Sequence, residues 1–91
     1  MSGPPAVTLT VRVAVADSWE TFAFTASRID GVAALKRRAL DAAHIDPARA
    51  DRYDVKLGGA LVADESRTLA DLGLPDGAQL VVLSRRRRPV R

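Results

Sequence analysis

The longest stretch with helical periodicity covers residues 29–43, whereas the other apolar segments alternate in the manner of strands. Its apolar side chains recur every three or four residues and form one stripe, made of Val32, Leu35, Ala39, Leu40 and Ala43. Charged residues fall largely outside this stripe, namely Lys36, Arg37, Arg38 and Asp41. Ser27, with Asp30 three residues later, predicts the N-cap. A single helix with one apolar stripe must pack against another element, and we expect a small sheet.

Two alternating runs before the helix predict a β-hairpin. In residues 7–15 the five valine and leucine side chains at odd-numbered positions share one face of a strand. Residues 16–18 are turn-like, and residues 19–25 alternate again, with Phe22 and Phe24 expected as a core pair.

The chain after the helix predicts shorter elements. Pro47 indicates a helix end near His44, because proline disfavours helical geometry at the preceding residue. After a polar connection at residues 46–52, the pattern predicts three further strands, one tight reversal at Gly58-Gly59 and one helical turn capped by Thr68. The expected strands cover Tyr53–Leu57, residues 60–62 and residues 79–84. The helical turn, TLADLGL, is expected to place Leu69, Leu72 and Leu74 inward, before a turn at Pro75-Asp76-Gly77.

This element order predicts an α+β fold, a mixed sheet of four to five strands with one main helix packed across it. We expect a flexible leader at residues 1–6, one domain at residues 7–84 and a basic tail at residues 85–91. The 91 residues include no cysteine, which excludes disulfides and thiolate metal sites, and no secretory signal or membrane-spanning run is visible. We therefore expect a cytoplasmic protein.

The net charge of +3 divides unevenly along the chain. Residues 1–84 contain nine Lys and Arg against eleven Asp and Glu, whereas residues 85–91 contain five Arg. A folded nucleic-acid-binding domain would carry positive charge on its body as well. The tail residues Arg85, Arg86, Arg87, Arg88 and Arg91 can attract phosphates or anionic lipid. A solvated tail, or the cytoplasmic flank of a missing membrane region, is the alternative.

Local motifs resemble ubiquitin and its β-grasp relatives. The closest similarity is R-T-L-A-D-L-G-L at residues 67–74, followed by a turn and the apolar run AQLVVL; I-D-G-V-A at the helix start and V-K-L-G-G at residues 55–59 add to it. The resemblance covers about residues 7–85 and implies the β-grasp fold. Ubiquitin-like modifiers end in a diglycine, but Arg88 and Pro89 occupy those positions and no glycine follows Gly77. Ordinary conjugation is therefore not expected.

Relatives without a diglycine are the closer resemblance. The chain is similar to YukD/EsaB-type ubiquitin-like proteins of bacterial type VII secretion and to the cytosolic ubiquitin-like domain of the membrane channel component of such systems. The family's recognition patch is an apolar spot on the exposed sheet face, around the third and fifth strands. Here Lys56 falls at the centre of this patch, and only the neighbouring position, Leu83, remains apolar. Ordinary ubiquitin receptors are therefore expected to bind poorly.

Catalytic chemistry has few candidate groups in this sequence. His44 is the only histidine, and its place near a helix C-terminus suits a structural role. No nucleophile with an orienting base is visible, and no metal or cofactor site is expected. We predict that the protein is not an enzyme.

A partner-binding surface is the remaining candidate site. Strand parity places Trp19 outward, opposite Phe22 and Phe24, although packing under the hairpin or on an arginine stem is the alternative. Lys56, Val81 and Leu83 are expected to share this exposed face with Trp19 if the strand order is family-like.

These features predict a monomeric, non-catalytic protein-docking module, with type VII secretion or a similar bacterial assembly as the favoured context. The alternatives are a covalent modifier with an atypical C-terminus, a weak nucleic-acid or anionic-membrane binder acting through the tail, and an accessory subunit of an oxygenase. Membrane association through a partner or a missing C-terminal region is the alternative to a purely cytoplasmic location.

Overall fold

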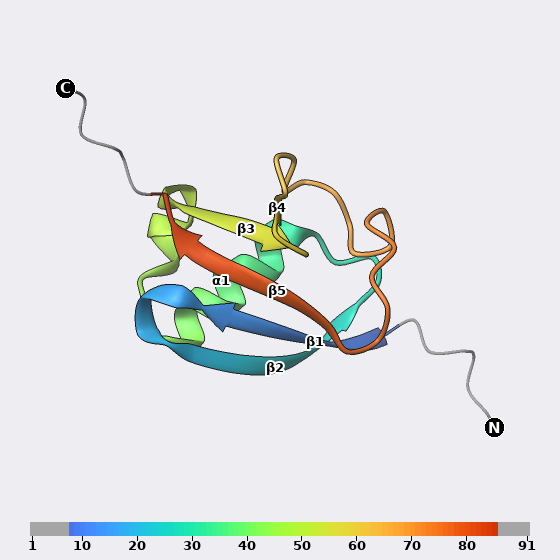
Figure 1. Cartoon of the computed structure of the whole chain (residues 1–91), viewed down its shortest axis with the longest axis horizontal. Helices are drawn as coiled ribbons and strands as arrows, with labels where there is room; N and C mark the ends of the chain where they lie inside the picture. The colour runs from blue at the N-terminus through green and yellow to red at the C-terminus, as the bar shows by residue number, and fades with distance from the viewer. Residues whose placement is uncertain (1–7, 86–91) are drawn as a thin grey trace.

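The computed structural model describes residues 8–85, so the predicted leader and Arg86, Arg87, Arg88 and Arg91 lie outside the described residues. A five-stranded sheet has the order β2-β1-β5-β3-β4. Its strands are Thr8–Val15 (β1), Glu20–Ser27 (β2), Tyr53–Leu57 (β3), Ala60–Leu61 (β4) and Ala78–Ser84 (β5). The β1–β5 pair is parallel and the other pairs are antiparallel. Helix α1, Val32–Ala42, crosses one face (Figure 1). The predicted α+β architecture is confirmed.

The core lies between α1 and the central strands, as the alternation predicted. Inward residues of β1 and β5 are almost fully buried, namely Leu9, Val11, Val13, Val15, Leu80 and Val82. Phe22 and Phe24 are only partly buried, which corrects the prediction of a core pair. The reason is topological, because β2 lies at the edge of the sheet and pairs only with β1 among the described strands. The guanidinium of Arg38 covers the Phe24 ring at 4.8 Å from its centroid.

Helix α1 begins three residues later than predicted, and Ser27 is not its cap. Ser27 is the last residue of β2, and its backbone N–H donates to the Asp30 carboxylate at 2.9 Å. The N-cap is Gly31, which has no capping side chain. Instead, backbone carbonyls of the later loop accept from the first helical N–H groups, Val32 to Arg67 and Ala33 to Glu65, both at 3.0 Å.

The end of the helix agrees with the prediction. Ile45 N–H donates to the Leu40 carbonyl and His44 N–H to the Asp41 carbonyl, which is the Schellman arrangement. His44 adopts a left-handed conformation with φ 63°, and its side chain is exposed. Beyond it, the predicted polar connection contains a 3-10 helix, η2 (Pro47–Arg52), capped by the Asp46 carboxylate.

The segment between β4 and β5 forms turns rather than the predicted short helix. Thr68 and Asp71 exchange side-chain to backbone hydrogen bonds at 3.0 and 3.1 Å, so the predicted cap and the single turn that it closes are present, but this turn is not a regular helix. Leu69 and Leu74 are buried, and Leu72 is half-buried. The predicted turn at Pro75-Asp76-Gly77 is present, and Gly77 adopts a positive φ of 86°, which glycine accepts without strain.

Lys36 is buried, contrary to the prediction that it lies outside the apolar stripe. Its side chain is 4% exposed, and its ammonium lies 2.5 Å from the Glu65 carboxylate. The same ammonium donates to the Tyr53 carbonyl at 2.8 Å. Lys36 therefore joins α1 to the loop after β4 and to the start of β3.

Candidate protein-docking face

The candidate site is the open face of the sheet, the face opposite α1. The pairing register places one residue of each strand in a single row across this face. In sheet order the row reads Thr21, Ala14, Val81, Lys56 and Leu61. Strand parity places Leu83 and Asp54 in the neighbouring row, where they are directly paired. The predicted grouping of Lys56, Val81 and Leu83 on one face is present in this register.

Lys56 lies between two apolar neighbours in its row, Val81 on one side and Leu61 on the other. Its side chain is half-buried, as is that of Val81. Within residues 8–85 the ammonium forms neither an ion pair nor a hydrogen bond. The centre of the face therefore combines apolar area with a cation that a carboxylate on a partner can neutralise.

Leu61 belongs to this face and was not predicted as a site residue. Its side chain is 54% exposed and lies directly opposite Lys56. The sequence does contain the necessary signal. A two-residue turn at Gly58-Gly59 pairs Leu57 with Ala60, and the next pair outward is then Lys56 with Leu61.

Trp19 lies beside the corner of this face and is 93% exposed, which resolves the alternative of packing under the hairpin. It follows the 3-10 turn η1 (Ala16–Ser18) and adopts the left-handed conformation, φ 58° and ψ 29°. For a bulky side chain this conformation costs about 1 kcal/mol relative to ordinary backbone geometry. Trp19 and Leu83 line one open hollow of about 580 Å³, together with Ala16, Asp17 and Ser84.

Arg85, predicted to begin the tail, is tied to the sheet. Its guanidinium donates to the Asp54 carboxylate at 2.7 and 3.0 Å, and its backbone N–H donates to the Arg52 carbonyl at 2.7 Å. These bonds with Asp54 raise the pKa of Arg85. Arg85 therefore continues the β5 edge beside β3.

Tyr53 is the only tyrosine, so its ionisation can be followed directly. Burial, followed by the charge and hydrogen bond of Asp17, raises the pKa of Tyr53 above 10.0. Because the fold favours the neutral phenol, this contribution to stability is complete below the unfolded pKa and is lost as pH rises through the folded one. We expect the phenolate absorbance of the folded protein to appear at higher pH than in the urea-unfolded protein.

An Asp17→Asn variant tests the two causes separately. It should return the Tyr53 midpoint only part of the way, because burial, which is the largest single cause, remains. Equal midpoints in the folded and unfolded proteins would contradict the prediction.

We compared the sequence and the structure with known proteins. No family model matches the sequence, and no curated protein is significantly similar. Among solved structures, a Caldiarchaeum subterraneum ubiquitin superposes with TM-score 0.72 at 18% identity, covering 91% of this chain and 96% of that one. The ubiquitin-like domain of an Arabidopsis thaliana protein gives TM-score 0.73 at 19% identity, covering 99% and 90%. The fold is ubiquitin-like.

A third ubiquitin-like comparison is the structure titled "Molecular Mimicry of SUMO promotes DNA repair", with TM-score 0.74 at 18% identity, covering 87% of this chain and 94% of that one. Within residues 8–85 no three metal-ligating side chains gather. No helix in that part of the chain is long and apolar enough to span a membrane.

Proposed function

We propose that this ubiquitin-like protein is a non-catalytic docking module that binds a partner protein through the open face of its sheet. The observation that carries the proposal is the exposure of Trp19 in a left-handed conformation beside Leu83. A large aromatic ring held in water at the cost of backbone strain contributes little to this fold. It can bury a large area on a partner at low entropic cost.

The complementary partner surface has two properties. It is apolar opposite Trp19, Val81 and Leu83, and it presents a carboxylate to Lys56. We further propose that the module serves a bacterial multiprotein assembly such as type VII secretion. That context is supported by the sequence resemblance to YukD/EsaB-type proteins and by an Ala-, Arg- and Asp-rich composition typical of GC-rich genomes.

The test is an N-terminally tagged chain expressed in its source organism, with each lysate divided between a denaturing blot and a native pull-down. The variants are Trp19→Ala and Leu83→Asp, and Ile29→Asp is the matched control because Ile29 is 78% exposed elsewhere. We expect one band at the monomer mass and one stoichiometric partner. Trp19→Ala should weaken partner binding at least tenfold, as a buried aromatic anchor does, whereas Ile29→Asp should not change it.

Two outcomes would overturn the docking proposal. A ladder of heavier species that survives denaturation would establish a covalent modifier with an atypical C-terminus. Binding that is lost on replacing Arg86, Arg87 and Arg88, falls steeply with salt and ignores Trp19→Ala would establish an electrostatic tail binder. Thermal melting of each variant verifies that it remains folded.

A further inference from the structure

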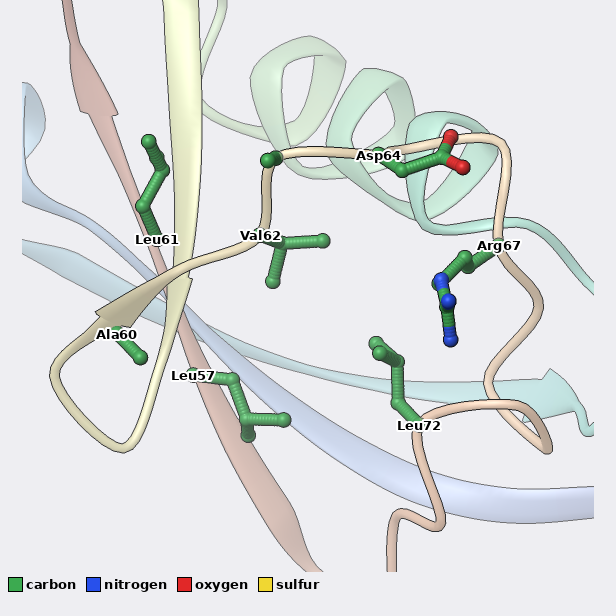
Figure 2. A pocket seen from close by; sticks show the side chains of 8 residues that line it. Leu57, Ala60, Leu61, Val62, Asp64, Arg67 and Leu72 are labelled. Atoms are coloured by element: carbon green, nitrogen blue, oxygen red, sulfur yellow. The ribbon is translucent and has the colours of Figure 1, made fainter.

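A second surface feature is an apolar hollow of about 400 Å³ between the β3–β4 hairpin and the loop of residues 62–67. Figure 2 shows Leu57, Val62 and Leu72 pointing toward one another across it. Val62 is buried, whereas Leu57 and Leu72 are half-buried. The volume falls within the range of about 300 to 1,000 Å³ that is typical of ligand sites.

Hydrogen bonds fix each wall of this hollow to the rest of the fold. On the hairpin side, Val62 N–H donates to the Val55 carbonyl at 2.8 Å. On the loop side, the carbonyls of Glu65 and Arg67 accept from the start of α1, and the Glu65 carboxylate pairs with buried Lys36. The loop cannot close over the apolar floor without breaking these bonds. The site is therefore preorganised, which lowers the entropic cost of binding.

The two charged side chains at the rim, Asp64 and Arg67, differ in whether they already have hydrogen-bond partners. The Asp64 carboxylate accepts from the Ser66 N–H at 3.0 Å and from the Ser66 hydroxyl at 2.5 Å, and these bonds lower the pKa of Asp64. In Figure 2 the Arg67 side chain instead extends from the loop toward Leu72. Its guanidinium forms no ion pair or hydrogen bond within residues 8–85. The rim thus offers a cation with no bonded partner among the described residues, beside a carboxylate that is already hydrogen-bonded and is also stabilised by the charge of Arg67.

The backbone beside the hollow favours a polypeptide as the occupant. Strand β4 ends the sheet and pairs only with β3 among the described strands. The outer edge of such a strand can align with an extended chain.

We propose that this hollow binds an extended segment of a partner protein in which an aliphatic side chain is followed by an acidic one. The aliphatic group enters between Leu57, Val62 and Leu72, where its burial removes apolar surface from water. The adjacent carboxylate pairs with the Arg67 guanidinium, whose planar fork matches carboxylate geometry. This hollow lies apart from Trp19 and Leu83, but Leu61 lines both it and the open face of the sheet. Trp19→Ala should therefore leave binding at this hollow unchanged, which separates the two proposals.

The probe is a capped peptide of sequence Gly-Ser-Leu-Asp-Ser-Gly, titrated to millimolar concentration into the ¹⁵N-labelled chain and followed by amide chemical shifts. Two matched peptides replace Leu by Ala or Asp by Asn. We expect the first peptide to shift the amides of Val62, Arg67 and Leu72. Both matched peptides should bind about threefold or more weakly, which is the range of one exposed ion pair or a small apolar contact.

Protein variants distinguish specific peptide binding in the hollow from non-specific electrostatic attraction. Arg67→Gln should reduce the affinity for the Asp peptide to that for the Asn peptide, whereas Arg37→Gln, the same change on an exposed helix position, should leave it unchanged. Leu72→Trp should fill the hollow and abolish binding without lowering the melting temperature. Shifts confined to Val81 and Leu83, equal binding of all three peptides, or no shifts would each overturn the proposal.

Discussion

Replacing Glu65 with glutamine is expected to destabilise the protein by about 3 kcal/mol, because it leaves the Lys36 ammonium buried without a counter-charge. Lys36 is 4% exposed and Glu65 20%, so the reverse change is less severe. Lys36→Met leaves a carboxylate that still reaches water, and we expect a loss of about 2 kcal/mol. Urea denaturation of the single variants measures both.

The double variant Lys36→Met/Glu65→Gln tests whether the two residues act together. Its loss should be smaller than the sum of the single losses, because neither partner is then left as an unpaired buried charge. Arg37→Met is the matched control, since Arg37 is exposed, and should change stability by less than about 0.5 kcal/mol. Strict additivity, or single losses no larger than that of the control, would refute the coupling.

Leu69→Ala is expected to cost about 3 to 4 kcal/mol, a large fraction of the 5 to 15 kcal/mol typical of a domain. Leu69 is 0% exposed and lies within the long segment between β4 and β5 that has no strand or helix. Its side chain anchors that segment to the core, and truncation leaves a cavity that the surrounding strands cannot fill.

Ile29→Ala is the control for this change, because it also truncates an aliphatic side chain but at a position that is 78% exposed. It should shift stability by less than about 0.5 kcal/mol. A Leu69→Ala loss below about 1 kcal/mol would mean that the segment does not depend on this contact. Thermal and urea melts should rank the two variants in the same order.

Strand positions were predictable because alternation reports burial directly. The faces of β1 and β5 follow from sequence parity, and the same parity groups Lys56, Val81 and Leu83 on one face. The tight turn at Gly58-Gly59 also fixes the register of β4. The position of Leu61 opposite Lys56 can be derived from that register.

The incorrect predictions have their cause in contacts between residues that lie far apart in the sequence. The helix begins at Val32 because carbonyls from residues 65 and 67 accept its first N–H groups, and no local pattern encodes that contact. Burial of Lys36 likewise depends on Glu65, which lies 29 positions later in the chain. The exposure of Trp19 was one of two alternatives, and its left-handed backbone has no signature in a non-glycine residue.

The parallel pairing of β1 with β5 joins the two ends of the described chain at the centre of the sheet. Because the strands run in the same direction, pulling the start of β1 away from the end of β5 loads their ladder in shear, with all its hydrogen bonds sharing the force. The same pairing requires the last strand to leave the ribosome before the sheet can close. Force applied between the two ends of the described chain therefore acts along the β1–β5 ladder, and the sheet is complete only after synthesis of β5.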